Sequence, residues 1–475
     1  MQNRGLFIGG REVPGHGAPL PVRNPYNQEV LAEIATATAA DVDLAIREAQ
    51  HGLSVWRSTP AWKRGEVLAR AATLLRERAE EYARTITLES GKPIRDARAE
   101  VQRAIQVWQF AAEAAKDITG EVVPMDAAMG GETRWGMVLR VPVGVVAAIT
   151  PFNFPLNLVS HKVAPALAAG NSVVLKPASA TPLTSLNLAG LLGEAGLSPS
   201  VLNVVVGGGG QVGDVLVADE RVAMVTFTGS LAVGRRIHDH AGVKRVTLEL
   251  GSNSPNIVFA DADLDLAASA LTRAAFAFAG QVCISAQRIY VQKPVYDDFL
   301  SRFVKRVESL KLGDPLDEAV DLGPMITPEE AGRVEEWIAR AVEAGARVVT
   351  GGRRTGAMFM PTVLADVRPD MEIVCQEAFA PVVSVVAFET MDEAVAMAND
   401  SIYGLQAGVF TRDINTALRV AAAIEAGGVW INESSIYRQD NYPYGGVKMS
   451  GLGREGVRYA IEEMTERKFV GIRLS

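Results

Sequence analysis

Short apolar runs alternate with helical stretches between residues 142 and 250, and this alternation constrains the fold more than any other feature of the sequence. Apolar runs of four to eight residues bounded by turn signals indicate strands, and the longer periodic segments between them indicate helices. The alternation predicts a parallel sheet covered on both faces by helices, which is a doubly wound α/β domain. The expected strands are 144–149, 172–175, 201–206, 222–227 and 245–250, and the expected helices are 156–169, 182–195, 211–218 and 232–241.

Polar and glycine residues follow these strands, at the sheet edge where doubly wound domains bind ligands. The sequence reads TPFNFP after the first strand, KPAS after the second, GGGG after the third and TGS after the fourth, and Glu249 lies at the end of the fifth. Each signal is weak alone, because a chain with 44 glycines matches G-x-G-x-x-G by chance, as at 208–213. Together they predict a site with glycine backbone for a pyrophosphate, a lysine for ribose or phosphate, an amide and a carboxylate.

The rest of the chain extends this domain. At 475 residues it is too long for one compact core, so two or three domains are expected. Residues 1–36 are expected to form short strands and turns, and 41–116 to form helices interrupted by Gly91-Lys92-Pro93. Residues 122–141 alternate weakly around Gly130-Gly131, which predicts a hairpin. That hairpin either lies on the surface of the same domain or pairs with another subunit.

Composition excludes several classes of function. The net charge is −8 and no run of lysine or arginine forms a phosphate-binding face, so nucleic acid is not an expected partner. Two cysteines do not make a disulfide framework and suit a reducing compartment. The N-terminal segment lacks the apolar core of a signal peptide, and the apolar tract at 141–149 is far shorter than a membrane span of roughly 18 residues. A cytoplasmic protein without a membrane segment or a metal site is expected.

Cys283 stands between small residues in FAFAGQVCISAQR, residues 276–288. A thiolate is a nucleophile, and small neighbours leave a reacting carbon room to approach it. A lone cysteine beside alanine, valine and isoleucine is nevertheless more often a small buried core residue. The second cysteine, Cys375, is expected to be such a buried residue.

Six motifs decide between these alternatives. TPFNFP, LKPA, FTGSLAVG, LELG, GQVC and PYGGVKMSGLGREG follow one another over nearly the whole chain, which in this order resembles the aldehyde dehydrogenase superfamily. The resemblance implies an aldehyde dehydrogenase fold, with a Rossmann-like cofactor domain, an α/β catalytic domain and a β arm that forms a homodimer or homotetramer. The implied boundaries are 1–121 and 142–250 for the cofactor domain, 251–450 for the catalytic domain, and 122–141 with 451–475 for the arm.

The resemblance also implies the catalytic roles. Cys283 matches the nucleophile that attacks the aldehyde carbon, and Asn153 matches the side-chain donor of the oxyanion hole, beside the backbone N–H of Cys283. Glu249 matches the general base that activates water. Its presence argues against the CoA-acylating branch, and the retention of all three residues argues against a structural homologue without activity. Lys162 and Glu455 match a proposed proton relay, or they form a structural ion pair.

The implied cofactor is NAD or NADP. Lys176 resembles the residue that binds the adenosine ribose, and Ser179 stands where many NAD-using relatives have a glutamate that would repel a 2′-phosphate, so NADP becomes possible. Glu377 and Phe379 resemble the contacts to the nicotinamide ribose. Ser252 replaces a usual glycine and has no functional account. The other residues expected around the cofactor are Thr150, Pro151, Phe152, Gly209, Gly213, Phe227, Thr228, Gly229, Ser230, Val233 and Leu250.

The expected substrate pocket is polar. The segments NFPLN, AGQVCIS and YRQDNYPYGG resemble the lactaldehyde and non-phosphorylating glyceraldehyde-3-phosphate dehydrogenase branch, which favours a short hydroxylated aldehyde such as lactaldehyde. The alternative is an aldehyde with a distal anion, such as a semialdehyde, phosphonoacetaldehyde or glyceraldehyde 3-phosphate; Val282, where phosphate-using relatives carry arginine, argues against a phosphorylated one. Arg438 is expected to be partly solvated at the mouth of the pocket. The expected lining residues are Arg103, Phe154, Asn157, His161, Val282, Ile284, Arg438 and Tyr444.

Overall fold

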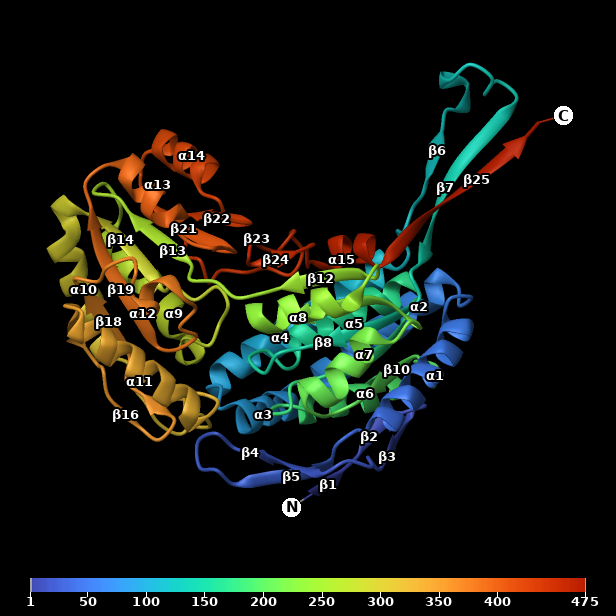
Figure 1. The fold of residues 1–475 in the computed structure, drawn as a ribbon, viewed down its shortest axis with the longest axis horizontal. Helices are drawn as coiled ribbons and strands as arrows, with labels where there is room; N and C mark the ends of the chain where they lie inside the picture. Colours follow the sequence, from blue (N-terminus) through green and yellow to red (C-terminus); the bar gives the residue numbers. More distant parts are fainter. Residues whose placement is uncertain (1, 475) are drawn as a thin grey trace.

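The computed structural model describes residues 2–474 and contains two α/β bodies and a projecting arm (Figure 1). The larger body is built on an eight-stranded sheet of order β24-β12-β11-β8-β9-β10-β2-β3. Its five central strands run parallel, as predicted, and β2, β3 and β24, which lie outside them, pair antiparallel with their neighbours. The strands are β2 (Leu6–Ile8), β3 (Arg11–Val13), β8 (Val145–Ile149), β9 (Ser172–Lys176), β10 (Leu202–Val204), β11 (Val222–Thr228), β12 (Arg245–Glu249) and β24 (Gly451–Leu452).

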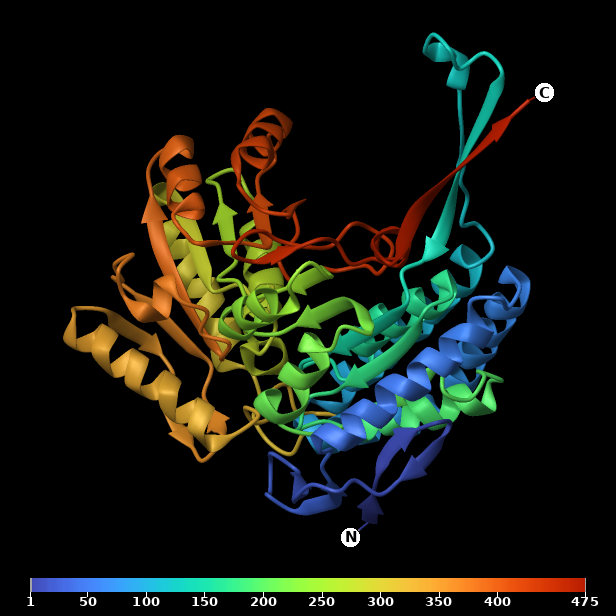
Figure 2. The same ribbon diagram turned by 45° about the vertical axis from the view of Figure 1, so that its right-hand side comes forward.

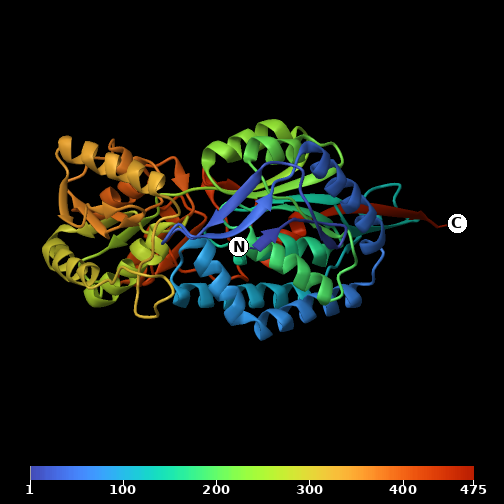
Figure 3. The same ribbon diagram turned by 90° about the horizontal axis from the view of Figure 1, so that it is seen from below.

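Helices cover both faces of this sheet, which Figure 3 shows from below. One face carries α1, α7 and α8, and the other carries α5 and α6 with α2, α3 and α4 outside them. Because β8 and β9 are buried along their whole length, β8 is apolar throughout and β9 is apolar from Val173 to Leu175, without the alternation of a half-exposed strand. The helices are α1 (Ala39–Trp56), α2 (Ala61–Glu77), α3 (Ala79–Ser90), α4 (Ile94–Ala114), α5 (Asn157–Ala169), α6 (Leu183–Glu194), α7 (Asp214–Ala218) and α8 (Leu231–Ala241).

The strand order reverses between β8 and β11, since β8 is followed in the sheet by β9 and β10 on one side and by β11 and β12 on the other. Such a reversal opens a crevice at the carboxyl ends of the strands, where ligands bind. Residues 150–153 follow β8 and residues 229–230 follow β11, so both of these predicted segments lie at the crevice.

The smaller body contains a seven-stranded sheet of order β15-β18-β19-β14-β13-β21-β22, parallel except for β15. It is packed between α9 and α10 on one side and α13 and α14 on the other, with α11 and α12 beside β18. Its strands are β13 (Pro255–Val258), β14 (Arg288–Gln292), β15 (Arg347–Thr350), β18 (Thr362–Ala365), β19 (Val382–Phe388), β21 (Gln406–Phe410) and β22 (Gly428–Ile431), and its helices are α9 (Leu264–Phe276), α10 (Tyr296–Glu308), α11 (Pro328–Glu343), α12 (Glu372–Cys375), α13 (Met391–Asn399) and α14 (Ile414–Ala423).

The arm is a three-stranded sheet that projects from the larger body (Figure 2). It contains β6 (Glu121–Val123), β7 (Arg134–Pro142) and β25 (Thr465–Arg473), and β25 pairs with β7 along nine residues. Residues 451–464, which the sequence assigned to the arm, lie instead on the larger body. There β24 pairs with β12, and α15 (Val457–Glu463) packs on α5.

Residues near the N-terminus form the expected short strands, including a small sheet of β1 (Gln2–Arg4), β5 (Val30–Ala35) and β4 (Pro19–Arg23). None of the helices among residues 2–474 combines the length and apolar character that crossing a membrane requires. In the same part of the chain, no three His, Cys, Asp or Glu side chains gather as metal ligands would.

Candidate active site

Asn153, Glu249 and Cys283 come from facing edges of the two bodies. Asn153 follows β8, Glu249 is the last residue of β12, and Cys283 lies in the loop between α9 and β14. The Asn153 Nδ2 donates to the backbone oxygen of Gln281 at 2.9 Å, which ties the cofactor-side loop to the Cys283 loop. One N–H of that amide remains for another acceptor. An apolar cluster that includes Phe152, Phe154 and Tyr444 surrounds the sulfur.

The backbone before Cys283 is in an unusual conformation. Phe278, Ala279 and Gly280 have φ values of 48°, 53° and 67°, so three consecutive residues are left-handed. A Cβ on Gly280 would lie 2.0 Å from the backbone oxygen of Ala380, so only glycine fits there. Left-handed phenylalanine and alanine are costly, and such strain persists where surrounding packing overdetermines it, often at functional sites.

Cys283 is half-buried, and its Sγ lies 3.1 Å from the hydroxyl of Tyr444. Burial raises the pKa of the Cys283 thiol to about 11, against the opposing effects of the Tyr444 hydrogen bond and the Arg438 charge. The thiolate is the reactive form, so this thiol requires stabilising partners or a base before it attacks a carbon.

Glu249 is a buried carboxylate without a partner. Neither of its oxygens makes a hydrogen bond with any residue in the described range. Burial, with the nearby negative charge of Glu455, raises the pKa of Glu249 well above its usual value. A carboxylate with a raised pKa and free acceptor atoms can take a proton from water near neutral pH, which is what a general base requires.

Lys162, Glu455 and Arg438 form a buried ion-pair network behind Glu249. Lys162 Nζ and Arg438 Nη2 each lie 2.8 Å from a different oxygen of Glu455. Burial alone would raise the pKa of Glu455, but the charges of Lys162 and Arg438 hold it well below its usual value. Glu455 therefore stays ionised at neutral pH. Lys162 and Glu455 therefore form the predicted ion pair, and their role as a proton relay stays a prediction.

The adenosine end of the predicted cofactor site fits a bound dinucleotide. Lys176 ends β9 with its ammonium buried, and among residues 2–474 its only hydrogen-bond acceptor is the backbone oxygen of Pro177, at 3.2 Å. Burial lowers the pKa of Lys176 to about 8. Gly208 and Gly209 are exposed, and a Cβ added at either would have no atom within 4 Å. The nearby Ser179 hydroxyl donates to the Gly207 backbone oxygen at 3.1 Å. A buried cation beside accessible glycine backbone suits ribose and phosphate.

At the nicotinamide end of the predicted cofactor site, Glu377 contacts the segment that joins the two bodies. Its carboxylate accepts from the Ser252 backbone N–H at 3.1 Å, and burial raises the pKa of Glu377 to about 7. Phe379 packs edge-on against Phe152 at 5.9 Å between ring centres. The contact of Ser252 is made by its backbone, while its hydroxyl lies 3.2 Å from that of Ser254.

A cavity of about 470 Å³ leads to Cys283 between the two bodies. Seven of the eight predicted substrate residues line it, namely Arg103, Phe154, Asn157, Val282, Ile284, Arg438 and Tyr444. The prediction for His161 is wrong: its side chain is fully buried outside the cavity, and its Nε2 lies 2.7 Å from an oxygen of Asp440.

The expectation that Arg438 is partly solvated is also wrong. Its side chain is 6% exposed, its guanidinium lies 3.6 Å from the centre of the Tyr444 ring, and it is paired with Glu455. Replacing Arg438 would therefore disturb the network behind Glu249 and the ring beside Cys283. Cys375 likewise differs from expectation, since it is half-buried rather than buried.

Asp440 was missed by the sequence reasoning and organises the polar side of the cavity. Its carboxylate binds Arg103 through two hydrogen bonds of 2.6 and 3.1 Å, and it also accepts from Asn157 at 3.4 Å. Burial would raise the pKa of Asp440, but His161 and Arg103 hold it well below its usual value. Only its place in the polar segment YRQDNYPYGG hinted at such a role.

Lys92 and Glu100 form a second group that the sequence did not indicate. They make a fully buried ion pair in the cavity wall. The Lys92 ammonium lies 3.7 Å from the centre of the Phe154 ring, and Glu100 accepts from the backbone N–H groups of Leu156 and Asn157 at 2.9 and 3.1 Å. In the sequence, Gly91-Lys92-Pro93 indicates only that a helix ends there.

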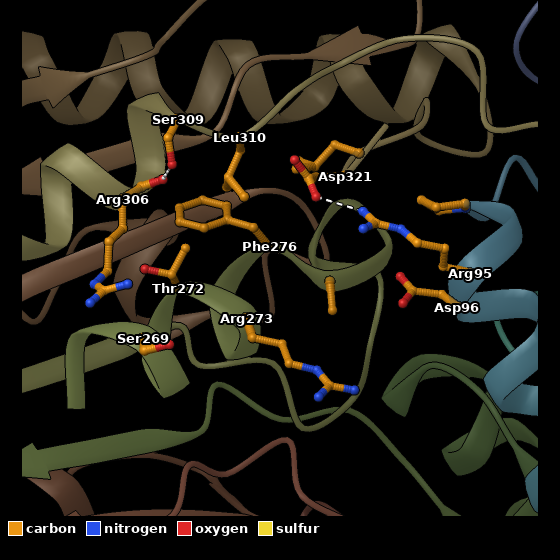
Figure 4. A pocket seen from close by; sticks show the side chains of 13 residues that line it. Arg95, Asp96, Ser269, Thr272, Arg273, Phe276, Arg306, Ser309, Leu310 and Asp321 are labelled. Atoms are coloured by element: carbon orange, nitrogen blue, oxygen red, sulfur yellow. Dashed lines mark hydrogen bonds and ion pairs between the residues drawn. The ribbon is translucent and has the colours of Figure 1, made fainter. Parts of the chain in front are cut away.

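Arg273 differs from the other cations of the cavity. Arg103, Arg438 and Lys92 are each paired with a carboxylate, whereas the Arg273 guanidinium makes no ion pair or hydrogen bond with any residue from 2 to 474. It is exposed at the end of α9, in the wall shared with an adjoining cavity of about 380 Å³. Figure 4 shows that cavity, with the Arg95–Asp321 ion pair on its far side.

Comparison with known proteins agrees with this geometry. The model of the aldehyde dehydrogenase family matches residues 13–470. A 3-sulfolactaldehyde dehydrogenase from Priestia aryabhattai is 49% identical over 100% of this chain and 99% of its own length. A lactaldehyde dehydrogenase from Methanocaldococcus jannaschii is 42% identical over 98% of this chain and 99% of its own.

A solved structure gives the same result. Glyceraldehyde-3-phosphate dehydrogenase GapN from Methanocaldococcus jannaschii, complexed with NADP, is 43% identical to this chain. It superposes with a TM-score of 0.92 over 96% of this chain and 99% of its own. The matched family model and these full-length relatives show that the chain belongs to the aldehyde dehydrogenase family.

Proposed function

We propose that this protein oxidises a short 2-hydroxylated aldehyde to the carboxylic acid with NAD(P)⁺, and that the preferred substrate also carries a distal anion. The observation that carries the proposal is the meeting of Cys283, the Asn153 amide and the unpartnered Glu249 carboxylate beside a cavity with polar walls. The 3-sulfolactaldehyde and lactaldehyde dehydrogenases among its relatives are named for hydroxylated three-carbon aldehydes.

The chemistry assigned to the chain is covalent. The Cys283 thiol releases its proton to water and its sulfur attacks the aldehyde carbon, and the free N–H of Asn153 with the backbone N–H of Cys283 stabilises the resulting oxyanion. Each such donor is typically worth about 3–4 kcal/mol in the transition state. NAD(P)⁺ supplies the hydride acceptor when bound, held by Lys176 at the adenosine end and Glu377 at the other. Glu249 then takes a proton from the water that releases the acyl group from Cys283.

The choice of substrate is tested on a panel of lactaldehyde, 3-sulfolactaldehyde, succinic semialdehyde and propanal, each with NAD and NADP. A kcat/KM for propanal equal to that for the hydroxylated aldehydes would contradict the proposed preference. Product formation only after addition of CoA would instead place the chain with the acylating enzymes.

We expect the Arg273 guanidinium to bind the distal anionic group of the substrate, because it is the cation of the cavity that has no ion pair among the described residues. We expect Arg273→Gln to lower kcat/KM for 3-sulfolactaldehyde by about three- to tenfold, the effect of one partly solvated charge pair, and to leave lactaldehyde nearly unchanged. Arg306→Gln is the matched control, since Arg306 lines only the adjoining cavity. An equal fall for both aldehydes would mean that Arg273 does not contact the anion.

Cofactor choice is expected to depend on position 179. A glutamate there would accept from the ribose 2′-hydroxyl and repel a 2′-phosphate, so Ser179→Glu should shift the ratio of kcat/KM toward NAD by tenfold or more, roughly 1.4 kcal/mol. Ala180→Glu adds the same charge one residue further on and is the control. If the ratio does not change in Ser179→Glu, Ser179 does not face the ribose.

Cofactor binding should weaken above pH 8. The pKa of Lys176 is lowered to about 8, so the ammonium is charged below that pH and loses its charge as the pH rises through it. Above that pH, binding of an anionic ligand therefore requires the Lys176 amine to take up a proton, which weakens the binding. Cofactor titrations between pH 7 and 9.5 should show affinity falling with pH, and Lys176→Met should remove this dependence. An affinity that stays constant in the wild type would place the phosphates away from Lys176.

The arm supports a proposal about assembly. Val122, Trp135 and Phe469 are 84%, 65% and 52% exposed on its strands, and large apolar side chains exposed together mark interaction surfaces. We propose that the arm, residues 122–141 with 465–473, pairs with other copies in a homodimer or homotetramer.

Residues 1–121 and 142–250 would form the cofactor domain and 251–450 the catalytic domain. Two unpaired cysteines favour a cytoplasmic location.

A further inference from the structure

Tyr444 is aimed at the sulfur of Cys283. Its side chain is 2% exposed, and within residues 2–474 its hydroxyl has one hydrogen-bonding neighbour, the Cys283 Sγ at 3.1 Å. Two backbone hydrogen bonds join Tyr444 to Glu455, of 3.1 Å from Tyr444 N–H and 2.6 Å from Glu455 N–H. The phenol is therefore placed by its backbone as well as by packing.

Arg438 fixes the other side of the ring. Its guanidinium lies 3.6 Å from the ring centre and is itself held by Glu455. A cation over an aromatic face is attracted to the ring electrons, and withdrawal of electron density makes the phenol a stronger donor. The ring therefore lies between Arg438 and Cys283, with its hydroxyl oxygen 3.1 Å from the sulfur.

The surroundings of Cys283 make such a donor necessary. Burial disfavours a thiolate most, followed by the charges of Glu377 after α12 and Glu249 at the end of β12, whereas the Tyr444 hydroxyl and Arg438 favour it. Arg438 is already neutralised by Glu455. Burial raises the pKa of Tyr444 well above its usual value, so the phenol remains protonated and able to donate throughout the working pH range.

We propose that the Tyr444 hydroxyl donates a hydrogen bond to the Cys283 thiolate and so sets the reactivity of the resting thiol, an inference that rests on the proposed role of Cys283 as the nucleophile. The thiol proton leaves to water, the phenolic proton stays on Tyr444, and no other bond changes. When the sulfur bonds to the aldehyde carbon, negative charge moves to the substrate oxygen and the hydrogen bond from Tyr444 weakens.

The test measures the thiol pKa without any aldehyde. The rate of Cys283 alkylation by iodoacetamide is followed from pH 6 to 11 by mass spectrometry of the Cys283 peptide, which separates it from Cys375. We expect Tyr444→Phe to raise the thiol pKa and to slow alkylation near pH 8 by about ten- to hundredfold, the range for a charge-assisted hydrogen bond. Tyr442→Phe is the matched control, because the Tyr442 hydroxyl donates to Gln406 at 2.7 Å.

A second variant controls for the case in which Tyr444→Phe fails to fold. Replacement of Tyr444 by 3-fluorotyrosine keeps the ring and makes the phenol more acidic, so it should lower the thiol pKa and speed alkylation. An unchanged thiol pKa in folded Tyr444→Phe, or an equal rise in Tyr442→Phe, would overturn the inference. If the protein oxidised none of the four aldehydes, the proposed function would be refuted. The alkylation measurement would still test the role of Tyr444, because alkylation needs no substrate.

Discussion

The Cys283→Ser variant should lose aldehyde oxidation by about 10⁴-fold or more, because removal of a covalent nucleophile leaves only binding and the oxyanion donors. A serine hydroxyl in this half-buried site has no strong base in contact with it, so it stays protonated near neutral pH. Cofactor affinity should be retained, since Lys176 and Glu377 lie on other segments. Steady-state turnover with lactaldehyde and a cofactor titration measure the two quantities separately.

Cys375→Ser provides the control for the loss of a thiol. Cys375 is half-buried at the end of α12, and its Sγ contacts only the backbone oxygen of Asp370, at 3.9 Å, among the hydrogen-bonding atoms described. Its replacement should leave turnover near the wild-type value. Retention of more than about a hundredth of the activity in Cys283→Ser would remove that residue from the role of nucleophile.

Glu249→Gln should slow release of the acyl group far more than its formation. The amide keeps the shape of the carboxylate but cannot accept a proton from water, a loss worth about 10²–10⁴-fold in rate. Pre-steady-state mixing should therefore show one equivalent of reduced cofactor per site in a fast burst, followed by a slow steady rate. In the wild type, kcat should fall as the pH falls through the raised pKa of Glu249, because the protonated acid is not a base.

Glu433→Gln is the companion variant, because Glu433 also lines the cavity and its carboxylate contacts only Ser434 in the described structure. It should retain both phases at wild-type rates. If the burst in Glu249→Gln slows in the same proportion as the steady rate, Glu249 acts before or during attack by Cys283.

Local sequence patterns were sufficient for the parallel sheet. The strands β8 and β9 are buried on both faces, so β8 is apolar throughout and β9 is apolar from Val173 to Leu175, and the helix between them keeps its own period. Residues that follow buried parallel strands must gather at one edge, which is why Asn153, Lys176 and Glu249 could be placed near one site from sequence alone. The six motifs then supplied the family and Cys283.

The polar lining of the cavity was decided by tertiary structure. Asp440 binds Arg103 and His161 across 337 and 279 residues of sequence, and Arg438 turns inward because Glu455 and the Tyr444 ring receive it. Periodicity records which face of an element is buried, but it carries no information about which distant side chain neutralises a buried charge. Such a charge takes whichever partner the packed chain brings within hydrogen-bonding distance, because leaving it unpaired costs several kcal/mol.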